Sequence, residues 1–367
     1  MAINIGIVGL PNVGKSTLFN ALSSAGAESA NFPFCTIEPN VGIVPVPDPR
    51  LKALALIYGS QAILPTSIEV VDIAGLVRGA AKGEGLGNQF LGNIRAVDAV
   101  LHVVRCFEDG QVIHVEGSVN PTRDVETIET ELIFKDLDTL EKRLTGIVKF
   151  TKSTGKQGDD ARAMAATLEQ LKAHLESGKM ARTFAGIDTP EMRELCLLTA
   201  KRVLFVANVG ESHAADPSSN NFYKELVKIA ETRGADVVHI CASIEAEISE
   251  LPEADRTDFL ATVGLSEPGL NRVVRAAYHT LDLITYLTAG PKETRAWTIT
   301  RGTLAPGAAG VIHTDFERGF IRAEVMNWED LVTLKSEAAV KQAGKMRVEG
   351  KTYEVKDGDV MHFRFNV

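Results

Sequence analysis

One stretch near the start of the chain, GLPNVGKST at residues 9–17, constrains the fold more than any other. It fits the pattern G-x-x-x-x-G-K-S, with an apolar run at Ile3–Val8 before it and a helix-like run at Ser16–Ala25 after it. This strand–loop–helix order is typical of a phosphate-binding loop (P-loop), whose glycines let main-chain N–H groups surround phosphates. A chance match in a glycine-rich turn is the alternative.

The loop supplies most of the predicted nucleotide site. Lys15 can reach the outer phosphates, which gives it a catalytic role, and the Ser16 hydroxyl can ligate Mg²⁺. The residues of the loop that we expect to bind nucleotide are Asn12, Val13, Gly14, Lys15, Ser16 and Thr17.

The composition is that of an ordinary globular chain. Its 367 residues give room for two or three domains, with 45% hydrophobic and 24% charged residues. No apolar run approaches the roughly 18 residues of a membrane span, and no basic segment precedes an apolar one at the start. The four cysteines lie apart, at Cys35, Cys106, Cys196 and Cys241. We therefore expect reduced thiols in a cytoplasmic protein without a membrane partner.

The formal net charge of −9 is unevenly distributed. From residue 281 onward 12 Lys and Arg balance 12 Asp and Glu, so the first 280 residues carry the whole negative excess. A net negative charge argues against wholesale binding of nucleic acid. A local RNA contact in the neutral tail is compatible with the composition, which does not demonstrate one.

Short apolar runs alternate with helix-like segments through the first part of the chain. The runs after the first are Val41–Val46, Ile68–Asp72, Ala99–Val104, Val203–Ala207 and Asp236–Ile240. Such alternation predicts an α/β fold with a mostly parallel sheet. The prolines around the first of these runs favour an edge strand there.

Residues 121–200 interrupt this rhythm. Apolar residues spaced 4-3-4-3 from Ile133 to Ile147, and 4-3-4 from Met164 to Leu175, predict two helices with a narrow apolar seam. A polar segment, 151–160, lies between them. We expect an antiparallel hairpin inserted into the nucleotide domain, with an exposed tip for which a solvated turn is favoured over a partner contact.

The last part of the chain changes character after residue 289. Residues 243–287 have a helical pattern, whereas 296–300, 319–325 and 361–365 are β-rich, with a turn-rich connector at 304–310. This pattern predicts a small α+β lobe at the end. The expected domains are a P-loop nucleotide domain at 1–122 and 201–282, the inserted helical hairpin at 123–200, and the tail lobe at 283–367.

Two further positions complete the predicted metal and phosphate contacts. Asp72 ends an apolar strand and begins the pattern D-x-x-G, so its carboxylate should lie near Mg²⁺ while the amide of Gly75 faces the γ-phosphate. Thr36 lies in a loop between the two motifs, where its hydroxyl can ligate Mg²⁺. The alternative for Thr36 is a loop residue without a role.

The base is expected to contact residues 208–211, after a later strand. GTPases of the P-loop class carry N-K-x-D there, but this segment is Asn208-Val209-Gly210-Glu211. A glutamate cannot hold the two guanine bonds at the reach of an aspartate, whereas adenine offers one donor and two acceptors. We therefore favour ATP, with Asn208, Val209 and Glu211 at the base. A degraded guanine site is the alternative.

Several segments together closely resemble one protein family. They are GLPNVGKST, NFPFCT, DIAGLVRGAAKGEGLGNQF, HVVRCFED, AWTITRGTLAPGAAGVIHTDFERGFIRAEV and DGDVMHFRFNV. The chain resembles the YchF family, also called Obg-like ATPases, over essentially its full length. The resemblance implies a Ras-like P-loop domain, a coiled-coil insertion and a C-terminal TGS domain of the β-grasp type. It also implies ATP preference and a link to ribosomes, translation and stress responses.

The sequence offers three candidates for the residue that positions the attacking water, His102, His114 and Asn93. Leu76 stands where Ras-like enzymes carry a glutamine, and leucine cannot bind water. His102 lies in an apolar strand and is expected in the core, whereas His114 lies in a loop, and the resemblance also points to it as catalytic. Asn12 is either a ligand of K⁺, as the resemblance to related GTPases implies, or a turn-forming residue.

Three functions follow from these patterns. The favoured one is a slow, Mg²⁺-dependent ATPase that acts as a switch on the ribosome, with an RNA contact through the tail as one reading of Arg318–Arg322. A β-strand with a core phenylalanine explains that segment equally well. The alternatives are a guanine-specific GTPase and a non-catalytic ATP-sensing module. Neither the partner's site nor the oligomeric state follows from the sequence.

Overall fold

The computed structural model describes residues 3–28, 40–73 and 92–366. They form two units, one of residues 3–42 and 69–273 and the other of 43–68 and 274–367. The second unit therefore includes residues 43–68, which the sequence-based division grouped with the nucleotide domain. Among the described residues, no helix is both long and apolar enough to cross a membrane.

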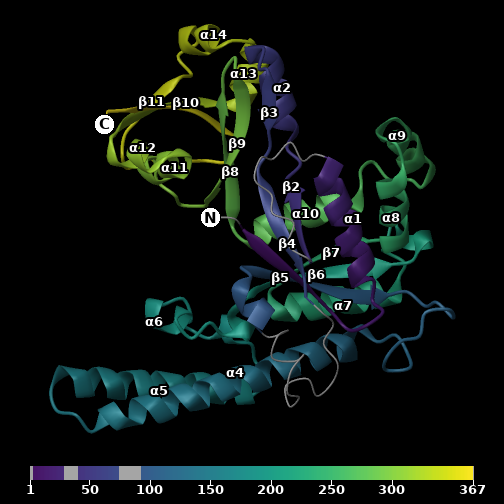
Figure 1. The fold of residues 1–367 in the computed structure, drawn as a ribbon, viewed down its shortest axis with the longest axis vertical. Coiled ribbons are helices and arrows are strands. Elements are labelled where there is room, and N and C mark those ends of the chain that lie inside the picture. Colours follow the sequence, from purple (N-terminus) through teal and green to yellow (C-terminus); the bar gives the residue numbers. More distant parts are fainter. Residues whose placement is uncertain (1–2, 29–39, 74–91, 367) are drawn as a thin grey trace. The chain divides into compact units, whose positions relative to one another are not determined.

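The first unit is built on a six-stranded sheet with the order β2-β4-β1-β5-β6-β7 (Figure 1). The strands are β1 (Asn4–Val8), β2 (Val41–Pro45), β4 (Ser67–Asp72), β5 (Ala99–Cys106), β6 (Arg202–Val209) and β7 (Asp236–Ile240). Strand β1 pairs in parallel with β4 and β5, and β6 pairs in parallel with β5 and β7. All eight residues of β5 are buried. The predicted parallel sheet is confirmed, with β2 at its edge.

Helices follow the strands of this sheet. They are α1 (Lys15–Glu28), α7 (Asn221–Arg233), α8 (Ala242–Glu250), α9 (Glu253–Thr262) and α10 (Gly269–Thr280). Helices α7 and α8 pack on β5 and β6 through a shared apolar core that includes Phe205, Leu226 and Ile244. This packing places the loops after β5 and β6 at one edge of the sheet, beside the end of β1.

A pair of long helices, α4 (Pro121–Thr151) and α5 (Lys156–Glu176), lies between β5 and β6 in the chain (Figure 1). The side chain of Asn120 caps the first turn of α4, and a proline follows at the first helical position. The seam that the spacing predicted is buried, with Leu140, Leu168 and Leu171 fully enclosed. A short helix, α6 (Pro190–Arg193), follows on the way back to β6.

One buried carboxylate attaches this helical pair to the returning chain. Asp136 of α4 is fully buried and accepts hydrogen bonds from the N–H groups of Leu198 and Thr199, both at 2.8 Å, and from the Thr199 hydroxyl at 2.6 Å. Burial raises the pKa of Asp136, and the hydrogen bonds from Thr199 and Leu198 oppose that shift. Because each oxygen has a donor, the side chain holds the middle of α4 against the segment just before β6.

The second unit has a six-stranded sheet with the order β11-β10-β12-β8-β9-β3. The strands are β3 (Ala62–Leu64), β8 (Leu283–Ala289), β9 (Glu293–Thr300), β10 (Phe320–Asn327), β11 (Arg347–Glu349) and β12 (Asp359–Phe365). The helices are α2 (Pro49–Tyr58), α11 (Ala305–Ile312), α12 (Thr314–Arg318), α13 (Trp328–Leu334) and α14 (Glu337–Gln342). Residues 43–68 join this unit because β3 pairs with β9, and Leu51 and Leu54 of α2 enter a core with Leu287.

Two expectations for this region are wrong. The helical pattern does not continue to residue 287, because β8 begins at Leu283 and pairs with β9. The turn-rich connector at 304–310 is the helix α11, whose Pro306 lies in the first turn. Its alanines at 305, 308 and 309 are fully buried, so small residues that suggested a turn instead allow close packing on the sheet.

Candidate functional site

The loop between β1 and α1 has the backbone shape that its sequence predicts. Asn12 and Gly14 have positive φ angles of 62° and 98°. A Cβ atom on Gly14 would lie 2.3 Å from Nδ2 of Asn208, so only glycine fits that position. The helix α1 begins directly after it, at Lys15. The loop is thus a compact turn that ends at a helix N-terminus, an arrangement suited to bind phosphate.

Lys15 and Asp72 form the charged part of this site. Lys15 is 8% exposed, and its Nζ donates to the carbonyl of Leu10 at 2.7 Å. Burial lowers the pKa of Lys15 to about 8, and the Asp72 carboxylate opposes that shift. Burial likewise raises the pKa of Asp72, against the influence of Lys15. An anion placed against Lys15 would relieve this unfavourable burial.

Asp72 also has an unused acceptor. It lies at the end of β4, beside Ile7 of β1, and its Oδ1 is buried without a hydrogen-bond partner among the described residues. Ser16 is exposed at the start of α1. A buried carboxylate oxygen that lacks a donor and an exposed hydroxyl are both oxygen ligands of the kind that Mg²⁺ prefers. Thr36, Gly75 and Leu76 lie outside the described residues, as do Cys35 and most of the glycine-rich segment after Gly75.

Asn208 links three parts of the sheet edge. Its Nδ2 donates to the carbonyl of Val13 at 2.9 Å, and its Oδ1 accepts from the N–H of Ala242 at 3.0 Å. The side chain is 3% exposed. Asn208 therefore joins β6, the P-loop and the start of α8, and only one amide hydrogen is left for a base.

The other two base-site candidates point in different directions. Val209 is buried in the apolar core under α7 and α8, which leaves its main chain as the part that can face a ligand. Glu211 is exposed, and its Oε1 accepts from the Ser243 hydroxyl at 3.2 Å. The structure thus brings Asn208 to the P-loop and Glu211 to the beginning of α8.

His114 is held inside the protein. The side chain is 4% exposed, its Nε2 lies 2.9 Å from Oδ2 of Asp124, and its Nδ1 accepts from the N–H of Glu116 at 3.1 Å. Because Nδ1 accepts, the proton is on Nε2 and is donated to Asp124. Arg123 donates to the other oxygen of this carboxylate. His114 follows Ile113, whose carbonyl accepts from Nδ2 of Asn12 at 3.1 Å.

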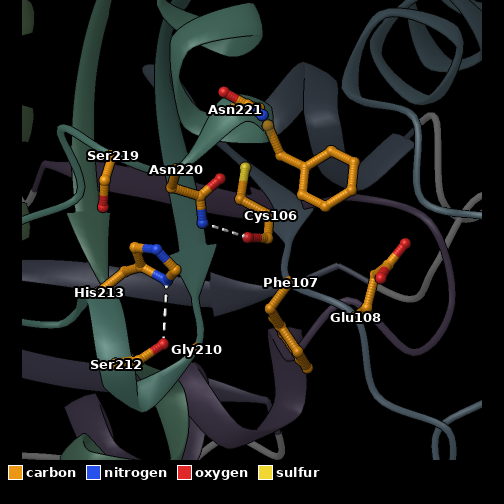
Figure 2. Close-up of a pocket in the computed structure, with 10 residues that line it drawn as sticks. Cys106, Phe107, Glu108, Gly210, Ser212, His213, Ser219, Asn220 and Asn221 are labelled. Atoms are coloured by element: carbon orange, nitrogen blue, oxygen red, sulfur yellow. Dashed lines mark hydrogen bonds between the residues drawn. The ribbon is translucent and has the colours of Figure 1, made fainter.

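A pocket of about 520 Å³ lies at the ends of β5 and β6 (Figure 2). Its lining comes from three parts of the chain. They are the end of β5 with the two residues after it, residues 208–211 (the base segment) with the residues that follow, and the start of α7. The residues are Cys106, Phe107, Glu108, Gly210, Ser212, His213, Ser219, Asn220, Asn221 and Phe222. Nδ2 of Asn220 donates to the carbonyl of Cys106 at 2.8 Å and fixes one wall.

Phe107 is the residue in this pocket that sequence reasoning missed. It follows β5 directly, and its Cβ lies 3.5 Å from the position that a Cβ on Gly210 would take. An aromatic ring beside the base segment offers a stacking surface for a planar ligand. The signal in the sequence was an aromatic residue at the carboxyl end of a parallel strand, where ligands of such sheets bind.

His102 is a core histidine, as predicted. It is 4% exposed, and its ring centroid lies 5.3 Å from that of Phe205. Burial lowers its pKa to about 3, with smaller effects from the positive charges of Arg182 and Lys15. Cys106 and Cys241 are buried free thiols and Cys196 is an exposed one. In the described ranges, no group of three or more His, Cys, Asp or Glu side chains could hold a metal ion.

Comparisons with known proteins agree with this geometry. The family model YchF-GTPase_C, described as a protein of unknown function, matches residues 283–366. The model MMR_HSR1, described as a 50S ribosome-binding GTPase, matches residues 4–141.

Full-length relatives and a solved structure are also similar. Proteins described as ribosome-binding ATPase YchF are 56% identical in Escherichia coli O157:H7 and 52% identical in Bacillus subtilis, and each match covers 100% of both chains. The structure of the Schizosaccharomyces pombe YchF GTPase is 37% identical with a TM-score of 0.88, and the match covers 99% of this chain and 97% of that one.

Proposed function

The chain belongs to the YchF family, and on that premise we propose that it is a slow, Mg²⁺-dependent ATPase that acts as a nucleotide-controlled switch on the ribosome. The names of its full-length relatives support ribosome binding and ATP hydrolysis as the general activity. The observation that carries the proposal is the P-loop with buried Lys15 beside Asp72, joined through Asn208 to a base segment that lacks the lysine and aspartate of guanine sites.

The phosphates of ATP bind along residues 12–17 in this proposal. Lys15 leaves the carbonyl of Leu10 and binds the outer phosphates, whose charge stabilises the ammonium form that burial disfavours. Ser16, Thr36 and Asp72 would hold Mg²⁺, which would supply positive charge against the outer phosphates. Gly75, which lies outside the described residues, is proposed to bind the γ-phosphate through its amide, as its motif predicts. The unpartnered oxygen of Asp72 supports this ligand set.

The base is adenine, and it lies between the main chain of Val209 and the pocket lined by Phe107. Asn208 has one amide hydrogen left, which suits a ring-nitrogen acceptor of adenine. Glu211 is engaged by Ser243 and is longer than the aspartate that holds guanine. Guanine, which needs two hydrogen bonds to one carboxylate, is therefore bound less well here. Adenine does not depend on those two bonds.

His114 orients the attacking water, and the proposal requires it to turn away from Asp124 first. A buried histidine whose two nitrogens are both engaged cannot serve a water molecule. Hydrolysis is slow in this proposal because the active arrangement must break these two hydrogen bonds. A K⁺ ion beside Asn12 would add positive charge at the phosphates, and its requirement is one arm of the test below.

The switch is proposed to act through three parts. The nucleotide domain, 1–122 and 201–282, binds ATP; the hairpin, 123–200, and the TGS domain, 283–367, contact the ribosome, the latter through RNA. Residues 142–158 at the hairpin tip contain five Lys or Arg and no Asp or Glu, in a chain whose net charge is −9. Such a segment suits contact with a polyanion.

Titration calorimetry with Mg²⁺ tests the base preference. ATP and GTP are titrated with and without K⁺, and phosphate release is followed at equal concentrations of the two nucleotides. The proposal expects tighter binding and faster release with ATP. Better hydrolysis of GTP would make the chain a guanine-specific GTPase, and tight ATP binding without release under single-turnover conditions with K⁺ would make it an ATP-sensing module.

A further inference from the structure

Arg105 is a buried charge that the proposed reaction has not used. It is 1% exposed and stands one residue before the end of β5. Its Nε donates to the carbonyl of Phe107 at 3.1 Å, its Nη1 to that of Val112 at 2.9 Å, and its Nη2 to that of Asp109 at 3.3 Å. Among the described residues no carboxylate lies within ion-pair distance of it.

A buried guanidinium without a counter-ion needs a structural reason. Desolvating a charge is costly, and here main-chain carbonyl dipoles compensate it. All three acceptors belong to one loop, residues 107–112. The planar fork of arginine donates from three separate nitrogens to three carbonyls set apart in the loop, whereas lysine carries all its N–H donors on one nitrogen and cannot reach the same three positions. The side chain therefore fixes the shape of this loop.

The loop connects two parts of the nucleotide site. At its beginning is Phe107, whose ring centroid lies 4.6 Å from the guanidinium carbon and which lines the pocket beside the base segment. Directly after its end is Ile113, whose carbonyl accepts from Asn12 of the P-loop, and then His114. Arg105 thus stands behind both the pocket wall and the segment that carries the histidine.

We propose that Arg105 is a positioning residue for the reaction: it holds loop 107–112 so that Ile113 meets Asn12 and His114 starts from a defined place beside the P-loop. This inference rests on the proposed ATPase function. The role of Arg105 involves no contact with substrate, because each of its three side-chain nitrogens donates to the protein's own main chain.

The variant Arg105→Lys tests the role, because it keeps the charge and loses the fork. Hydrogen–deuterium exchange should become at least tenfold faster for amides of residues 107–116 and stay unchanged in α7. The turnover number for ATP should fall at least tenfold, with the dissociation constant of ATP changed less than about threefold. The second variant, Asn12→Ala, removes the P-loop partner of Ile113.

A double-mutant cycle separates positioning from a general loss of stability. If Arg105 acts through the contact of Ile113 with Asn12, the double variant should lose little more turnover than the worse single variant. Asp136→Asn is the matched control: it breaks buried hydrogen bonds in the same unit, and it should leave both turnover and the exchange of residues 107–116 unchanged.

Each outcome decides a separate claim. Wild-type exchange rates in residues 107–116 of Arg105→Lys would overturn the positioning role, as would a turnover loss that multiplies with that of Asn12→Ala. A turnover loss in Asp136→Asn equal to that in Arg105→Lys would assign both to stability. If the wild-type chain hydrolyses no ATP, the proposed function fails, and the exchange comparison still decides whether Arg105 holds the loop.

Discussion

Replacing Asn208 by aspartate exchanges a donor for an acceptor at the centre of the nucleotide site. The new side chain has the same shape and keeps the hydrogen bond from the N–H of Ala242. Its second oxygen, however, takes the position of Nδ2, which lies 2.9 Å from the carbonyl oxygen of Val13. Two acceptors then face each other in a buried place, so Val13 and the P-loop must move apart from β6.

The expected effect on ATP binding follows from that one contact. A buried acceptor that loses its donor costs about 1–3 kcal/mol. The free protein avoids this cost by displacing the P-loop, and ATP has to bring the loop back before its phosphates fit. The cost therefore appears in binding, as an ATP affinity about fivefold to 150-fold lower, since 1.4 kcal/mol corresponds to a factor of ten.

Titration calorimetry of both proteins between pH 5 and pH 8 measures this effect. Burial beside a carbonyl raises the pKa of the introduced carboxyl, and its protonated form can again donate to Val13. The deficit relative to the wild type should therefore shrink as the pH falls. A folded Asn208→Asp protein that binds ATP within threefold of the wild type at pH 8 would refute the reasoning.

Three other predictions address Lys15 of the P-loop, the attachment of the hairpin and the hairpin tip. Because phosphates raise the pKa of Lys15 from about 8, ATP binding should take up a proton and weaken about tenfold from pH 7 to pH 9; equal affinities would contradict this. Asp136→Asn should lower the free energy of unfolding in urea by about 2–4 kcal/mol, because its amide group faces donors. Replacing two exposed lysines of the tip, Lys149→Glu with Lys152→Glu, should weaken co-sedimentation with ribosomes at low salt. The control, Lys224→Glu with Lys228→Glu, makes the same change of charge on exposed residues of α7 and should not weaken it.

The parallel sheet and its P-loop were predictable because their signals are local. Apolar runs flanked by turn residues define the strands, and the loop pattern fixes where β1 must end and α1 must begin. The edge position of β2 followed from its prolines. The seam of the hairpin followed from the 4-3 spacing, which only one helix face can produce.

The second unit was harder to predict because its signals depend on packing. Helix α11 consists mainly of Ala and Gly, and its alanines are buried in the core of this unit, where small side chains allow close packing. Helix α2 joins this unit through Leu51 and Leu54, although about 220 residues separate it in the chain from β8 (49–58 against 283–289). Contacts at such separation leave no periodic trace in either segment.

The site itself divides in the same way. Lys15, Asp72 and Asn208 were predicted as functional residues, because each lies in a motif with fixed spacing after a strand. The inward position of His114 was not, since it depends on Asp124 at the start of α4. Neither Phe107 nor Arg105 belongs to a nucleotide motif; their roles follow only from the pocket and from carbonyls that the fold brings together.

The contacts of the P-loop explain how ATP binding could be communicated. Three contacts define the loop: Lys15 to the carbonyl of Leu10, Asn208 to that of Val13, and Asn12 to that of Ile113. Only the contact of Lys15 with Leu10 uses a side chain that the phosphates would bind. ATP binding would therefore break this contact and leave the other two in place. The contact of Asn208 leads to α8, and that of Asn12 leads to the loop before His114 and α4. A shift of the P-loop on binding therefore reaches the base segment and the root of the hairpin by separate hydrogen bonds, which can be removed one at a time.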